Sequence, residues 1–236
     1  MALDAGRARL DLATGLLAPR VVRVTGCRAE VALVATTATL LGGDEVRLDV
    51  EVGTGTWLDL RDVAGTVAYH GRGRACRVDV RLTVAPGGTL TWAGEPLVVS
   101  GGAVVTRTLD VDVAAGGRLL LRDTVALGRS GEAGGDLRCT TTACVDGRPA
   151  LVEELRLGPS ARSQPGVLGG ARVVDTVTAL GWRPTGAPDV PSADVYVLER
   201  GGTVARVLAG EAHQSRLRDL WDHWGAQLEA SDEPPL

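Results

Sequence analysis

The stretches that decide the fold are three strand–turn–strand units in the middle of the chain: VEVGTGTWLDL (50–60), LTVAPGGTLTW (82–92) and VDVAAGGRLLL (111–121). Aligned without gaps, each unit has apolar residues at its first, third, ninth and last positions. Each also has glycine at its sixth position, namely Gly55, Gly87 and Gly116. Apolar alternation on both sides of a glycine is typical of two strands joined by a tight turn, because glycine accepts a positive φ. The units begin about 30 residues apart, a period that indicates stacked repeats.

The strands beside these turns have one polar and one apolar face. In 76–84 the residues Cys76, Val78, Val80, Leu82 and Val84 alternate with charged residues and threonine, and 46–52 follows the same pattern. Such strands favour sheets packed face to face, and the gaps between them are too short for crossover helices. We therefore predict a mainly all-β fold, an elongated β-sheet superhelix or irregular β-solenoid, in a single domain over residues 1–236.

The end of the chain changes period. Further strands are expected at 172–180, 195–198 and 204–208, between loop-rich stretches at 158–170 and 181–193. One amphipathic helix is expected over about 211–230, because a set of apolar residues falls on one helical face: Leu217, Leu220, Trp221, Trp224 and Leu228. The two tryptophans either form a partner-binding face or cover the end of the core. The tail 231–236 is expected to be disordered.

Composition excludes several classes of protein. All 25 basic residues are arginine, which points to a GC-rich genome, and the formal net charge is −4. An acidic chain is not expected to bind nucleic acid or an anionic membrane. The N-terminal residues lack a signal-peptide core and no long apolar run follows, so we expect a cytoplasmic protein whose four cysteines are reduced and buried.

No catalytic motif is evident. The chain lacks a nucleophile elbow, a P-loop and a zinc-protease motif, and has only three histidines, so we do not expect an enzyme. Three acidic residues do lie beside apolar or glycine-rich segments: Asp44, Glu95 and Glu132, with Arg129 near the last. Each is either a satisfied brace in a turn or a carboxylate that meets a cation, since a charge near a core is costly unless compensated.

Several segments in register resemble urease accessory proteins of the UreD/UreH family. They are LLGGDEVRLDVEVGTG (40–55), TVAY (66–69), PGGTLTW (86–92), Glu95-Pro96 and LGR (127–129). The resemblance runs from about residue 30 to the C-terminal helix.

The resemblance implies a fold and a role. The family forms an elongated β superhelix with helices at its C-terminal end and has no enzymatic activity. It binds the accessory protein UreF, which recruits the GTPase UreG, and the assembly delivers nickel to the urease apoprotein. An internal water-filled passage is thought to carry the metal, so Asp44, Glu95 and Glu132 are the expected passage residues. Nickel(II) would be bound only transiently, with no permanent cofactor.

Nickel binds carboxylate, imidazole and water, and a conduit must bind it weakly enough to release it. A chain with few histidines and no close cysteine pair suits such a passage. Two alternatives remain at this point: a purely structural β-solenoid, and a β-helix enzyme acting on carbohydrates. The second would predict a secretion signal.

Overall fold

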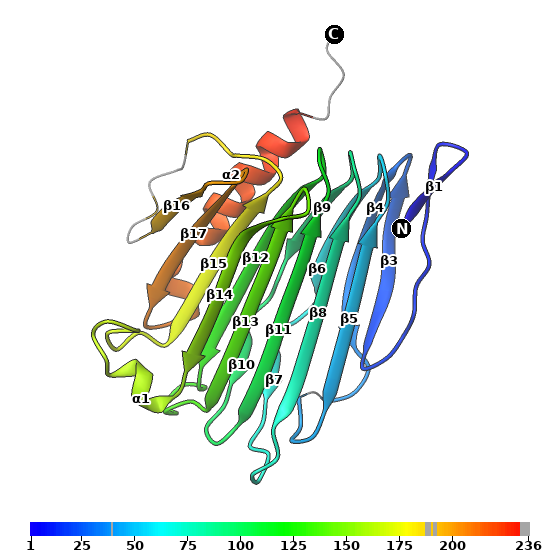
Figure 1. Cartoon of the computed structure of the whole chain (residues 1–236). Helices are drawn as coiled ribbons and strands as arrows, with labels where there is room; N and C mark the ends of the chain where they lie inside the picture. Colours follow the sequence, from blue (N-terminus) through cyan, green and yellow to red (C-terminus); the bar gives the residue numbers. More distant parts are fainter. Residues whose placement is uncertain (39, 187–189, 191–192, 232–236) are drawn as a thin grey trace.

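The structure, a computed structural model, describes residues 1–38, 40–186, 190 and 193–231, and strands dominate it (Figure 1). The bounds of the strands of the larger sheet are β3 Leu17–Thr25, β4 Arg28–Ala35, β6 Trp57–Asp62, β7 Thr66–Ala68, β9 Thr89–Ala93, β10 Leu97–Val99, β12 Arg118–Leu127, β15 Val173–Leu180, β16 Asp194–Leu198 and β17 Gly202–Ala209. Their order is β16–β17–β15–β12–β9–β6–β4–β3, and β10 pairs with both β12 and β7.

A smaller, five-stranded sheet faces the larger one. Its strands are β5 Glu45–Val52, β8 Cys76–Val84, β11 Val104–Val113, β13 Asp136–Val145 and β14 Arg148–Leu157, in the order β14–β13–β11–β8–β5. A hairpin of β1 (Ala2–Asp4) and β2 (Arg7–Arg9) lies at the N-terminus. The helical elements are α1 Pro159–Arg162, η1 Ala212–Gln214 and α2 Leu217–Ala230. Figure 1 shows the smaller sheet in front of the larger one, with α2 on the far side.

The repeat prediction is confirmed. In each unit a strand of the smaller sheet passes through a glycine turn into a strand of the larger sheet, and the glycines have φ of +64°, +66° and +75°. Parallel pairing keeps the copies in register, so Leu58, Leu90 and Leu119 are neighbours on β6, β9 and β12. The turns also stack, since Gly87 N donates to the Gly116 carbonyl oxygen at 3.2 Å. The result is a β-solenoid-like sandwich, the predicted fold class.

The core lies between the two sheets. The four apolar positions that the three units share all belong to one buried cluster. The alternate positions on β8 point outward, and Arg77 and Arg81 are exposed there. Burial of the apolar face is the main source of stability in such a sandwich.

A second core lies between the larger sheet and α2. Leu217, Leu220, Trp224 and Leu228 are buried against it, as the helical period predicts. The helix begins later than expected, because Ser215 has extended backbone (φ −76°, ψ 128°) that separates η1 from α2. His213 therefore lies in η1 instead of α2.

Other expectations have mixed outcomes. The strands predicted in the last third are present as β15, β16 and β17. The cysteines are unbridged, but only Cys76 is fully buried, and Cys139 and Cys144 are half-buried. Cys27 is exposed because it lies in the tight turn joining β3 to β4. Within the described residues, no helix is both long enough and apolar enough to cross a membrane. Of the predicted disordered tail, residues 232–236 lie outside the described part of the chain.

Candidate functional site

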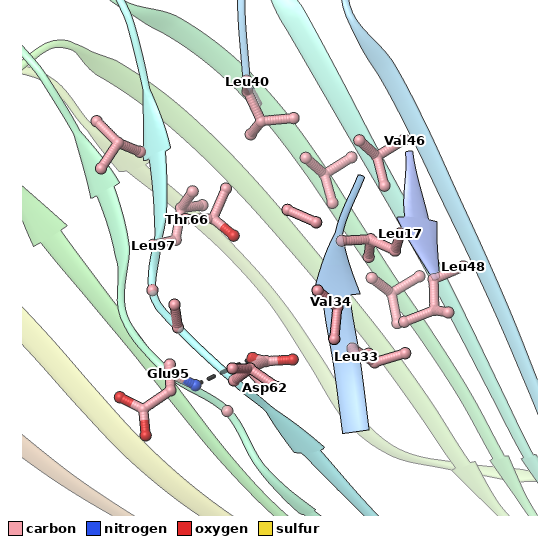
Figure 2. Close-up of a pocket in the computed structure, with 18 of the residues that line it drawn as sticks. Leu17, Leu33, Val34, Leu40, Val46, Leu48, Asp62, Thr66, Glu95 and Leu97 are labelled. Atoms are coloured by element: carbon pink, nitrogen blue, oxygen red, sulfur yellow. Dashed lines mark hydrogen bonds between the residues drawn. The ribbon is translucent and has the colours of Figure 1, made fainter. Parts of the chain in front are cut away.

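A cavity of about 380 Å³ lies between the two sheets. Apolar side chains from both sheets line most of it, among them Leu33 and Leu97 of the larger sheet and Val46 and Leu48 of the smaller one (Figure 2). A volume of this size is within the usual range for ligand sites of about 300–1,000 Å³. The cavity also reaches the surface, since Val63 and Tyr69 in its wall are exposed.

One end of the cavity is charged. Arg107 of β11 reaches across from the smaller sheet, and its Nη1 donates to both carboxylate oxygens of Asp123 on β12, each at 2.7 Å. These side chains keep 12% and 32% of their surface accessible although they lie between two sheets. Both residues line the cavity. Water can occupy this end, since it offers several hydrogen-bonding partners.

Asp62 lies at the same end, at the last position of β6. Its carboxylate accepts a hydrogen bond from the Glu95 backbone N–H at 3.0 Å (Figure 2). It also accepts one from Trp92 Nε1 at 3.3 Å. Burial raises the pKa of Asp62 to about 6, and these two hydrogen bonds only partly oppose that rise. In the described structure Asp62 has no salt-bridge partner, which distinguishes it from Asp123.

A second, smaller cavity of about 50 Å³ lies next to the first. The two cavities share Leu121 and Asp123 in their walls. The second is lined by Cys139 and by Glu153, whose two oxygens accept from Nη1 and Nη2 of Arg206, each at 2.7 Å. Burial raises the pKa of the Cys139 thiol to about 11, so this group is neutral at physiological pH.

These charges occupy positions where the strand pattern calls for apolar residues. Along β12 the inward residues are Leu119, Leu121, Asp123, Val125 and Leu127, and along β11 Arg107 lies between Val105 and Leu109. Period-two alternation puts alternate residues on the same face, so a charge in the apolar register must point into the core. Motif-based reasoning missed Asp62, Arg107, Asp123, Glu153 and Arg206, although this break in the alternation is visible in the sequence.

Of the three predicted passage residues, only Glu95 lines the cavity. Figure 2 shows its carboxylate pointing away from Asp62. The Glu95 side chain is 38% exposed, and its Oε1 lies 3.8 Å from Nη1 of Arg218 on α2. Glu95 therefore belongs to both the cavity wall and the surface beside α2.

Asp44 and Glu132 lie in turns. Asp44 Oδ2 accepts from the Leu41 N–H at 2.8 Å and closes the turn before β5. Glu132 Oε1 accepts from Arg129 Nη2 at 2.6 Å, and its Oε2 accepts from the backbone N–H groups of Arg129 and Gly101. These bonds, led by the Arg129 guanidinium, lower the pKa of Glu132 to about 2. The structure does not bring these two carboxylates together with Glu95.

The two helix tryptophans have different surroundings. Trp224 is 1% exposed and packs in the core under α2. Trp221 is partly buried, and its Nε1 is a buried donor with no hydrogen-bond partner among the described residues. Among all the residues that the structure describes, no group of three or more His, Cys, Asp or Glu side chains is arranged to hold a metal ion.

Fold and cavity together define a class: a β-solenoid-like sandwich with charged side chains inside it and a C-terminal helix on its outer face. Comparison with known proteins identifies the family. The family model described as "UreD urease accessory protein" matches residues 10–235, so the chain belongs to the UreD urease accessory protein family.

Curated relatives agree with this assignment. A Streptomyces griseus protein named "Urease accessory protein UreD 1" is 47% identical over 211 residues, covering 88% of this chain and 82% of the relative. A Streptomyces coelicolor protein named "Urease accessory protein UreD" is 38% identical over 224 residues, covering 91% and 87%. A Frankia alni protein of the same name is 41% identical over 212 residues, covering 80% and 71%. Family membership supports a role in urease maturation.

Proposed function

We propose that this chain is a non-catalytic, cytoplasmic urease maturation factor that passes nickel(II) through its interior to the urease apoprotein. It would act in complex with a UreF-type accessory protein, which recruits a UreG-type GTPase. The observation that carries this proposal is the charged lining shared by the two internal cavities. A purely structural solenoid would gain stability by filling this space with apolar side chains.

The arrangement of charges suits transit better than storage. Three carboxylates, Asp62, Asp123 and Glu153, follow one another along the two cavities. Two of them are already paired with Arg107 and Arg206. Tight metal sites usually surround the ion with several converging ligands, whereas single carboxylates and water give weak binding. A nickel ion would therefore find successive weak sites.

The predicted passage residues have different roles in this proposal. Glu95 keeps its role as a passage residue, at the point where the cavity wall reaches the surface near α2. Asp44, Glu132 and Arg129 are better explained as braces, because hydrogen bonds in their own turns account for the two carboxylates.

The test is an amide substitution at the point that both cavities share. In cells that co-express urease and its maturation proteins, Asp123→Asn should yield urease with less nickel, measured by metal analysis of the purified enzyme. Because Asp123→Asn leaves Arg107 unpaired, the double variant R107Q/D123N provides a second, charge-neutral test. Asp49→Asn, which removes an exposed carboxylate from the outer face of β5, is the matched control.

Retained binding to the UreF-type partner would show that the variants fold. Normal nickel content in urease made with D123N, alone or combined with E95Q and E153Q, would exclude the proposed route.

A further inference from the structure

The junction between the two cavities is occupied by an ion pair. Asp123 lines both cavities, and a single nitrogen of Arg107 contacts both of its oxygens at 2.7 Å. An ion moving from the larger to the smaller cavity must pass Asp123. In the structure, the guanidinium group of Arg107 already binds that carboxylate.

The fold fixes the backbone position of Arg107, but the guanidinium group at the end of its side chain can move. Arg107 occupies an inward position of β11 between the buried residues Val105 and Leu109. Arginine stays protonated under all physiological conditions, so its charge cannot be removed to open the junction. Its side chain is long and flexible, however, and the larger cavity beside it offers about 380 Å³. The smaller cavity, about 50 Å³, leaves far less room for a guanidinium group.

The neighbouring carboxylates frame this junction. Asp62, on the side of the larger cavity, accepts only from neutral donors in the described structure. Glu153, on the other side, is held by two nitrogens of Arg206. A cation that enters the larger cavity thus meets first Asp62, a carboxylate without a salt bridge in the described structure, and then Asp123, for which Arg107 competes.

We propose that Arg107 is a tethered cation that closes the junction at Asp123 and swings into the larger cavity when a divalent cation takes its place. This inference rests on the proposed passage and adds its regulation: the route is closed at rest and is opened by the cargo itself. Arg107 acts through Asp123 and is a positioning residue for the carboxylate, not a ligand of the metal.

Direct nickel binding tests the inference without any urease activity. The full chain, co-purified with its UreF-type partner, is dialysed against nickel(II) chloride, with the partner alone as the blank. Arg107→Gln should bind nickel about tenfold more tightly than the unchanged chain, because a charge-assisted competitor for Asp123 is gone. Arg107→Lys, which keeps the charge but carries it on a shorter side chain as a compact ammonium group, should give a smaller increase. R107Q/D123N should return to weak binding.

Arg47→Gln is the matched control. Arg47 also holds an aspartate, Asp49, through two nitrogens, but on the exposed face of β5. Its loss should leave nickel affinity unchanged.

The inference is overturned if neither R107Q nor R107K binds nickel more tightly than the unchanged chain. It is also overturned if R47Q produces the same gain. Failure of the passage itself gives a different result, namely normal nickel loading of urease with D123N. The two readouts are separate, so failure of the gate alone can be distinguished from failure of the passage.

Discussion

The placement of α2 depends on one buried carboxylate, Asp175 of β15. It is 0% exposed and accepts hydrogen bonds from Arg122 Nη2 at 2.9 Å, Thr124 Oγ1 at 2.8 Å and Ser215 Oγ at 2.7 Å. Ser215 lies two residues before α2, so this cluster ties the start of the helix to the larger sheet. We predict that Asp175→Ala lowers the free energy of unfolding by ~3–5 kcal/mol, the usual effect of leaving a buried charge without its partner.

A graded series tests the physical reason. Ser215→Ala removes one neutral donor and should cost ~1 kcal/mol. R122M/D175M removes both charges and should recover much of the loss, because apolar replacements of a buried ion pair are often tolerated. Urea unfolding followed by tryptophan fluorescence measures each value. A cost below ~1 kcal/mol for Asp175→Ala would refute the reasoning, since the cluster would then contribute no more than a surface ion pair.

The remaining predictions concern the turn carboxylate of Glu132 and the helix tryptophans. Because the folded pKa of Glu132, about 2, lies below its ordinary value of 4.5, its brace stabilises the fold above pH 4.5 and is lost as pH falls toward 2. Glu132→Gln should therefore be less stable than the unchanged chain at neutral pH, and urea titrations should show the difference shrinking across that window. A constant difference would mean that Glu132 acts through packing instead of charge. Trp224→Ala should cost ~3–5 kcal/mol in the same assay because Trp224 fills the core under α2. Trp221→Ala should leave most stability intact but weaken co-elution with the UreF-type partner in size-exclusion chromatography; unchanged co-elution would place the interface elsewhere.

The sequence predicts the repeat well because local and long-range requirements agree there. A glycine turn at Gly87 needs a positive φ, and the strands beside it need one apolar face, so two independent signals mark the same unit. The start of α2 is less predictable. Periodicity extends the helix back to 211, whereas hydrogen bonding of Ser215 to Asp175, which is 40 residues away in sequence, keeps the backbone extended there.

The candidate site was harder to predict for a related reason. Asp44 and Glu132 attract notice because they stand beside glycine-rich segments, yet those segments are turns that use the carboxylates locally. Asp123 and Arg107 attract little notice in one sequence, since strands with charged residues are common on a wet face. Only their phase relative to Leu121 and Leu109 shows that they point inward, and only the packing of two sheets shows that they meet.

The cavity follows from an interruption of the same repeat that builds the core. β6 ends at Asp62 and β9 ends at Ala93. The segments that follow them pair again where β7 meets β10, with Thr66 opposite Leu97. Because the copies are in register, both breaks fall side by side. The Glu95 N–H at this break has no partner in a strand ladder, and a buried backbone donor must be satisfied. The Asp62 carboxylate accepts it, which places a charge inside the sandwich and requires polar neighbours around it. The site therefore lies where the strand pairing of the repeat is interrupted, which explains why no single sequence motif marks it.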